Sequence, residues 1–134
     1  MSNFDTDIYS TINDLVSDLF PGGVYAHNLP ENWDVAKPTA VITHRTAAAV
    51  KTLDGITHET DHQMSIIIMA PDSEQLAYLC EEVHDRIDMY CMTAGNRIPD
   101  IQFVDDINSV DFDLDVYFRT QNYNVIYSPQ NEIL

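Results

Sequence analysis

The feature that most limits the fold of this chain is a pair of long extended segments joined at Asp54-Gly55. Residues 39–53 and 56–69 both have the residue pattern of strands. An Asp-Gly dipeptide between such segments is a strong hairpin signal, because both central positions of a type I′ turn need a positive φ. Each strand would run roughly 14 residues, or about 45 Å at about 3.4 Å per residue. Strands usually have about 5–6 residues, so the sequence predicts an unusually long hairpin.

Only the inner part of this hairpin, near Thr39–Thr43 and Ser65–Met69, has the large apolar residues of a core. The outer part places Ala47–Val50 opposite Glu59–His62, with too few large apolar groups to hold itself together. We expect residues 44–62, called the arm below, to project from the domain. A lone two-stranded ribbon is marginal in water, and its edges expose unpaired backbone groups. The arm therefore needs a partner, and a neighbouring copy of the chain is the simplest one.

Two amphipathic helices are predicted, one on each side of the hairpin in the sequence. Their apolar residues recur at helical spacing. The first stripe is Ile8, Ile12, Leu15, Val16 and Leu19, and the second is Leu76, Leu79, Cys80, Val83, Ile87 and Tyr90. Asp72, followed three residues later by Gln75, resembles a capping box at the start of the second helix.

The last third of the chain has the pattern of strands. A strand begins near Ile101, and residues 110–119 alternate between apolar and polar so cleanly that they predict one strand with a dry face and a wet face. Residues 1–127 would form one α+β domain, a mainly antiparallel or mixed β-sheet with both amphipathic helices packed on one face. Residues 128–134 would be a flexible tail.

The charge excludes several classes of function. The chain has 22 Asp+Glu against 6 Lys+Arg, a formal charge of −16. Nucleic-acid readers and proteins that bind anionic membranes depend on Lys and Arg, so both classes are disfavoured. Hydrophobic residues make up 45% of the chain, which argues against disorder. No apolar run is long enough to span a bilayer, no signal-peptide pattern is present, and two cysteines without a CxxC spacing fit a reducing cytosol.

One motif raises the possibility of an enzyme. The segment His58-Glu59-Thr60-Asp61-His62 matches HExxH, which on a helix places two imidazoles for zinc and a glutamate as general base. Glu81 or Glu82 could then be the third ligand. However, the segment follows the Asp-Gly turn and leads into a strand pattern, and on a strand residues i and i+4 lie roughly 13 Å apart. Solvated hairpin residues are the favoured interpretation, and a zinc metalloprotease with His58 and His62 as ligands is the alternative.

The acidic residues of the last third are a second candidate site: Asp105, Asp106, Asp111, Asp113 and Asp115. Carboxylates of this kind suit Ca²⁺ or Mg²⁺, but no DxDxDG loop is present. A solvated strand face is the favoured interpretation, with a cation-assisted subunit contact and a catalytic carboxylate pair as alternatives. Cys80 is interpreted as a core thiol and His84 as a surface histidine. Trp33 is either an interface anchor or a loop aromatic that folds back on the core.

The order of these elements resembles the tail terminators of long-tailed, siphophage-type bacteriophages, also called tail-completion or tail-to-head joining proteins. The resemblance spans nearly the whole chain. It rests on the opening helix Ile8–Leu19, Val24-Tyr25, the loop to Lys37-Pro38-Thr39-Ala40-Val41-Ile42, and the long hairpin. It continues through Ser65–Met69, the helix Asp72–Asp88, and the acidic loop and strands from Ile101 to Tyr127.

The resemblance implies a structural virion protein, with neither an enzymatic activity nor a cofactor. Such a protein forms a hexameric ring on the head-proximal end of the tail tube, stops tube polymerisation and joins the tail to the head. Its partners are further copies of itself, the tail tube protein and a head-completion or neck protein. It is assembled in the bacterial host cytoplasm, and DNA passes through the ring without specific binding. Another small neck or adaptor protein of the same fold is an alternative.

Two sets of residues are assigned on this basis. A carboxylate-rich bore does not hold the phosphate backbone, so DNA can slide. Asp105, Asp106, Asp111, Asp113 and Asp115 are the candidates for its lining. The residues expected at the contacts with other subunits or with the tube are Trp33, Arg45, Val50, Lys51, Leu53, Ile56 and Glu59.

Overall fold

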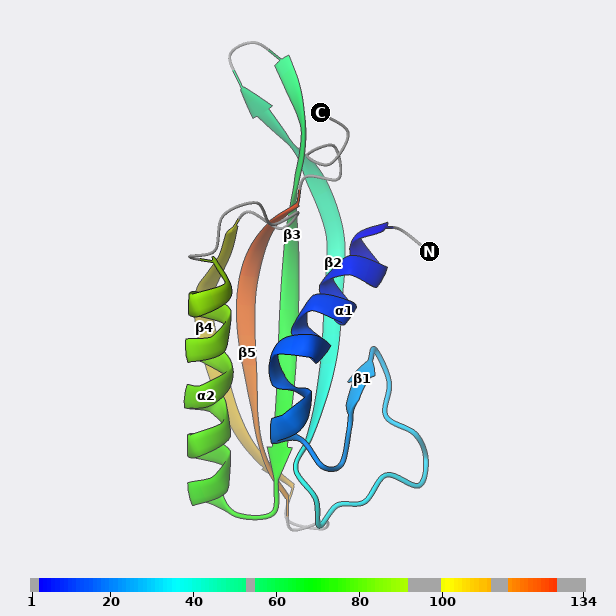
Figure 1. The fold of residues 1–134 in the computed structure, drawn as a ribbon, viewed down its shortest axis with the longest axis vertical. Helices are drawn as coiled ribbons and strands as arrows, with labels where there is room; N and C mark the ends of the chain where they lie inside the picture. The colour runs from blue at the N-terminus through cyan, green and yellow to red at the C-terminus, as the bar shows by residue number, and fades with distance from the viewer. Residues whose placement is uncertain (1–2, 53–54, 92–99, 112–115, 128–134) are drawn as a thin grey trace.

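The computed structural model describes residues 3–52, 55–91, 100–111 and 116–127 (Figure 1). The elements follow in the order α1 (Asn3–Val16), a 3-10 turn η1 (Ser17–Leu19), β1 (Val24–Ala26), β2 (Thr39–Thr52), β3 (Gly55–Ala70), α2 (Ser73–Cys91), β4 (Asp100–Asp111) and β5 (Val116–Tyr127). The strands form one five-stranded sheet in the order β1-β2-β3-β5-β4. The predicted α+β class is therefore confirmed.

The sheet is mixed, with antiparallel pairing everywhere except at one edge. β1 pairs in parallel with β2 over three positions, from Val24↔Ala40 to Ala26↔Ile42. β2 with β3, β3 with β5, and β4 with β5 are all antiparallel. A parallel neighbour needs a crossover connection, and the loop of residues 27–38 provides it here.

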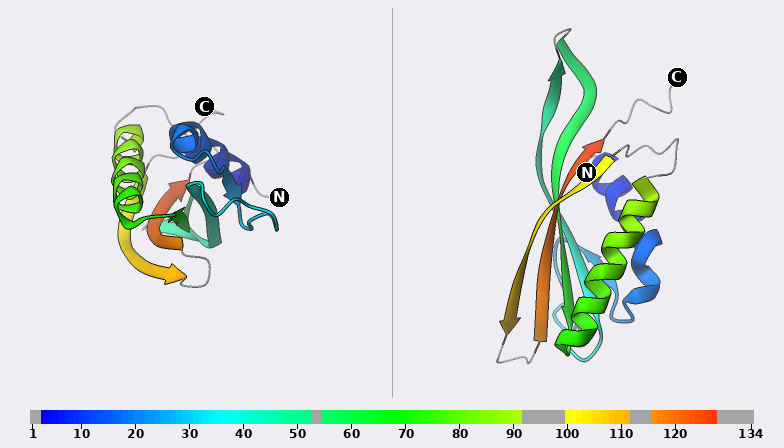
Figure 2. Two further views of the ribbon diagram at one scale, coloured as in Figure 1. Left: turned by 90° about the horizontal axis from the view of Figure 1, so that it is seen from below. Right: turned by 90° about the vertical axis from the view of Figure 1, so that its left-hand side faces the viewer.

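Both helices cover the same face of the sheet, as the side view in Figure 2 shows. Their apolar stripes pack on alternate residues of the central strands, because successive strand residues face opposite sides. Ile12, Val16, Val83 and Ile87 meet Ile66, Ile68 and Val125, and all seven side chains are fully buried. The predicted stripes are thus confirmed. The backbone N–H of Gln75 donates to Asp72 Oδ1 at 2.8 Å, as the capping-box pattern indicates.

Two glycines allow the chain to turn tightly between α1 and the sheet. Gly23 has a φ of +105°, in the left-handed region that side chains rarely adopt. A Cβ atom on Gly22 would lie only 2.7 Å from the carbonyl oxygen of Pro38. Ala40 N–H donates to the Gly23 carbonyl at 3.1 Å, so this turn holds β1 against the start of β2.

The long hairpin is present as β2 and β3, with 14 and 16 residues. Its turn differs slightly from the prediction, because Thr52 pairs with Gly55. Gly55 therefore belongs to β3, and the residues between the strands, Leu53 and Asp54, lie outside the described part of the chain. The pairing shifts register between Arg45 and Ala48 and again between Ala49 and Lys51. Such irregularities increase the local twist of a ribbon.

The outer part of this hairpin extends past the ends of β4 and β5 (Figure 1). The pairing of β3 with β5 reaches Thr60↔Tyr127, so the innermost residues of the predicted arm still belong to the main sheet. Beyond Thr60, β2 is the only described neighbour of β3.

One strand prediction is wrong. Residues 110–119 do not form a single strand, because β4 ends at Asp111 and β5 begins at Val116, and these two residues pair with each other. Apolar and polar residues alternate on both sides of a chain reversal. The alternation alone therefore cannot show that one strand ends and the next begins. Asp111 is the last residue of β4, whereas Asp113 and Asp115 lie outside the described residues.

Candidate interaction surface

A row of polar residues crosses four strands on the face of the sheet that the helices leave open. The pairing aligns Thr43 with Ser65, Ser65 with Asn122, and Asn122 with Asp105. Ser65 Oγ donates to Asn122 Oδ1 at 2.6 Å, and Asn122 Nδ2 donates to Asp105 Oδ1 at 2.7 Å. Hydrogen bonds thus join three strands through their side chains on this open face.

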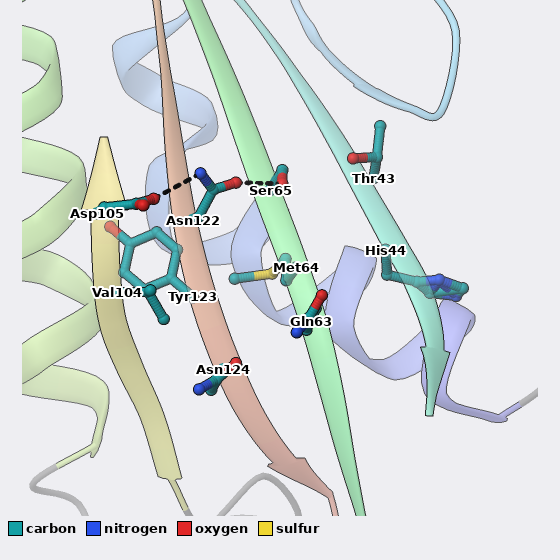
Figure 3. Close-up of a pocket in the computed structure, with 10 residues that line it drawn as sticks. All are labelled: Thr43, His44, Gln63, Met64, Ser65, Val104, Asp105, Asn122, Tyr123 and Asn124. Carbon is teal, nitrogen blue, oxygen red and sulfur yellow. Dashed lines mark hydrogen bonds between the residues drawn. The ribbon is translucent and has the colours of Figure 1, made fainter. Parts of the chain in front are cut away.

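The polar row borders a shallow hollow of about 430 Å³. Figure 3 shows Ser65, Asn122 and Asp105 in line, with Gln63 and Asn124 on the neighbouring positions of β3 and β5. The residues that line the hollow are Thr43, His44, Gln63, Met64, Ser65, Val104, Asp105, Asn122, Tyr123 and Asn124. Amide, hydroxyl and carboxylate groups dominate this lining, which suits hydrogen bonding to a protein surface.

Apolar residues cover the open face at the opposite end of the strands. Val41, Met69 and Val116 are buried there, and Tyr25, Leu29, Trp33, Ile67 and Phe118 pack against them. Trp33 lies in the loop between β1 and β2 and is half-buried in this cluster. Of the two interpretations of Trp33, its position in the isolated chain therefore matches a loop aromatic that folds back on the core. The loop covers this end of the open face, whereas the residues of the polar end are half-buried or exposed.

The structure separates two acids that the sequence places side by side. Asp105 belongs to the polar row of the open face, whereas Asp106 lines a second hollow together with Cys80 and His84 of α2. Both acids are exposed. A single surface cannot use both, because adjacent strand residues point to opposite faces.

The hollow on the helix side is lined by a buried thiol. Its Cys80 is buried at 2% exposure, and burial raises the pKa of the thiol to about 11. A thiol with so high a pKa is a poor nucleophile, as expected for a core thiol. Gln121, on the buried side of β5, donates to the Cys80 carbonyl oxygen at 3.0 Å and accepts from the Tyr123 hydroxyl at 2.9 Å. Burial raises the pKa of Tyr123 as well.

The HExxH segment lies on β3, so its backbone is extended. At about 3.4 Å per residue, His58 and His62 stand roughly 13 Å apart. A zinc ion bonds imidazole nitrogens at about 2.0–2.1 Å, so these two residues cannot share one. Within the residues that the structure describes, no group of three or more His, Cys, Asp or Glu is placed to hold a metal ion.

His62 differs from the prediction in one respect. Its side chain is only 9% exposed, so it is not a solvated hairpin residue. It occupies the same side of β3 as Met64 and Ile66, which face the helices. Its ring lies 6.3 Å from that of His44, which in turn lies 5.3 Å from that of His27. Three imidazoles from different segments therefore stand in a row at the base of the arm.

The residues expected at subunit or tube contacts are spread over the arm. Arg45, Val50 and Lys51 lie on β2, and Ile56 and Glu59 lie on β3. Leu53 lies outside the described residues. Trp33 lies near the other end of the sheet, at the apolar cluster. The residues predicted for these contacts thus lie in two separate regions of the fold.

Sequence reasoning missed the polar row and the histidine row. Thr43, Ser65, Asn122 and Asp105 are separated by up to 57 positions between hydrogen-bonded neighbours, and only the register of three strand pairs brings them into line. That Asp105 and Asp106 face opposite sides of the sheet could have been predicted from the sequence, because neighbouring residues of a strand point to opposite faces.

None of the helices in the described ranges is both long and apolar enough to cross a membrane. No model of a protein family matches the chain, and no curated protein matches it.

The comparison with solved structures does find a shared fold. A chain of the structure described as "Virion of native gene transfer agent (GTA) particle" aligns with a TM-score of 0.60 at 12% identity. The match covers 88% of this chain and 84% of that chain. At this identity the similarity is one of fold, and it extends over nearly all of both chains.

Proposed function

We propose that this protein is a structural component of a phage-like virion. Its role is to form a ring at the head-proximal end of a tail tube, to stop tube polymerisation and to join the tail to the head. The observation that carries the proposal is the fold shared with a chain of a gene transfer agent virion over 88% of the length. The resemblance of the element order to tail terminators, set out above, supports the more specific role.

The arm supports an assembly function. It extends past the main sheet and is available as a surface for other proteins. The proposed partners are further copies of the chain, the tube protein and a neck protein. The proposed location is the head–tail junction of the virion.

The proposed ring allows DNA to pass without holding it. Asp105 is exposed on the open face, and a wall of carboxylates repels the phosphate backbone. We therefore place the open face, with Asp105, toward the bore. Asp106 faces the helix side, so we do not include it in the proposed lining of the bore. Asp111, Asp113 and Asp115 remain candidates for that lining.

The proposed function includes no catalysis. The extended backbone of residues 58–62 removes the geometric basis of the zinc metalloprotease alternative. Elemental analysis of the purified protein is expected to give far less than one zinc per chain. Stoichiometric zinc that is lost in a His62→Ala variant would restore the enzyme hypothesis.

The direct test adds the purified protein to growing tail tubes and examines them by negative-stain electron microscopy. The expected result is a ring at one tube end and a stop in elongation. Val50→Asp with Ile56→Asp on the arm should weaken capping, whereas Tyr78→Asp, at an exposed position of α2 (56% exposed), should leave it intact. Tubes that grow and stay bare at every concentration would overturn the proposal. Binding to the neck alone would favour the adaptor alternative.

A further inference from the structure

Two strand edges of the sheet have no described neighbour. β4 is the outermost strand on one side. On the other side β1 covers β2 only at Ala40–Ile42, so residues 43–52 of β2 form a second open edge within the described part of the chain. An open edge presents backbone N–H and C=O groups that can pair with another strand.

The β4 edge combines exposed apolar groups with acid. Every residue from 102 to 109 is exposed. Phe103, Val104 and Ile107 are 42%, 53% and 59% exposed, and they make up half of the large apolar residues that are exposed in the described chain. The strand also contains four aspartates and no Lys or Arg. An exposed apolar strand at a sheet edge invites pairing, and its charge selects for a basic partner.

The β2 edge has the complementary character. β2 contains Arg45 and Lys51 and no acid, in a chain with 22 acids and only 6 Lys+Arg. Between the two cations lie Thr46 and the four apolar residues Ala47–Val50. Two of the other cations are engaged elsewhere, because Arg86 contacts Asp18 and Arg119 contacts Asn108. The outer part of β2 is thus a basic, apolar strand, and its charge is complementary to that of the acidic β4 edge.

We propose that residues 43–52 of β2 in one copy lie edge to edge along β4 of a neighbouring copy, with Arg45 and Lys51 against the β4 aspartates. This inference rests on the proposed ring, because it needs a second copy beside the first. The two edges lie on opposite sides of one sheet, so the contact is head-to-tail and each copy uses both edges. A contact of this type continues from copy to copy and closes into a ring when the rotation fits.

Charge reversal on each edge tests the contact. Variant A carries Arg45→Glu and Lys51→Glu, and variant B carries Asp105→Lys and Asp106→Lys. Either variant alone places like charges across every contact, so we expect its self-association to weaken at least about tenfold. In an equimolar mixture, β2 of variant A can pair with β4 of variant B, and β2 of variant B can pair with β4 of variant A. The mixture should therefore assemble again, with A and B in a 1:1 ratio.

Analytical ultracentrifugation over a range of concentrations measures these oligomers. A single chain that carries all four substitutions should also assemble, and a misfolded variant could not produce this rescue. The matched control reverses one cation and one acid away from both edges, Lys37→Glu and Asp85→Lys, which are exposed; it should assemble like the unmodified protein. Circular dichroism checks that each variant is folded.

The outcomes separate this inference from the proposed function. If the unmodified protein forms rings and caps tubes while variants A and B do so equally well, the edge contact is wrong and the ring proposal stands. If A and B are impaired but neither the mixture nor the four-fold variant recovers, the edge contact is also wrong. If the rescue is observed but no variant touches tubes, the edge contact holds and the tail role fails.

Discussion

The two faces of the sheet are built on different principles, although the same strands supply both. On β3, Met64, Ile66 and Ile68 face the helices and are at most 1% exposed, while Ser65 and Ile67 between them are only half-buried. On β5, buried Tyr123 lies between Asn122 and Asn124 of the open face. The covered face is specified by close packing, whereas the open face combines a smaller apolar cluster at one end with side-chain hydrogen bonds at the other. Stability should therefore depend more on the first face than on the second.

The largest expected effect comes from removing a core side chain. Ile66→Ala deletes a fully buried group beneath both helices and should lower the free energy of unfolding by about 2–5 kcal/mol. The matched control is Ile67→Ala. Ile67 follows Ile66 in β3, faces the open side and is only half-buried, so its loss should lower the free energy of unfolding clearly less. Urea denaturation followed by circular dichroism measures both. Equal losses at the two positions would abolish the distinction between the faces.

The next effect concerns the reactivity of Cys80. Because burial raises its thiol pKa from 9.0 to about 11, the thiolate fraction at pH 8 should fall about a hundredfold in the folded protein. A Cys91→Ser variant isolates this thiol. Iodoacetamide labelling followed by mass spectrometry should be very slow in buffer and fast in urea. Rapid labelling of the native protein would show that the helix-covered face opens readily.

Loss of a hydrogen bond should also destabilise the fold more on the covered face than on the open face. Gln121→Met keeps the volume but removes the acceptor of the buried Tyr123 hydroxyl and the side-chain bond to the Cys80 carbonyl, at a cost of about 1–3 kcal/mol. Asn122→Ala removes hydrogen bonds that water can replace on the half-buried open face, so its cost should be smaller. Thermal unfolding of the pair is the comparison; a larger loss for Asn122→Ala contradicts it.

The smallest effect is expected at an exposed ion pair between the two helical segments. The hydrogen bond from Arg86 lowers the pKa of Asp18 below 3.8. A lowered carboxyl pKa stabilises the fold at pH values above 3.8, and this contribution disappears as the pH falls through the lower folded pKa. Asp18→Asn should thus be slightly less stable than the unmodified protein at pH 7. The two should converge below pH 3.8, and a difference that persists there would assign the effect to something other than this charge.

Local patterns predicted the elements of the covered face well. The helical stripes ending in Leu19 and Tyr90, the Asp72 cap and the long hairpin all follow from periodicity, capping and turn chemistry, which act within a few residues. The reversal between Asp111 and Val116 was missed because no Gly, Pro or Asn marks it and the alternation continues on both sides.

The candidate surface was harder to predict because it depends on register. Asp105 aligns with Asn122 only after the pairing shifts between Phe103 and Asp105, and no local signal fixes the position of that shift. His62 was misjudged for a related reason. A polar residue on an apparently thin ribbon reads as solvated, yet the pairing of β3 with β5 continues past it to Thr60.

The strand β1 has only three residues, yet it limits where another strand can pair with β2. Since it occupies the side of β2 at Ala40–Ile42, any strand added along that side must stop before it. In the proposed edge contact, β1 would therefore limit how far β4 of the neighbouring copy can shift along β2.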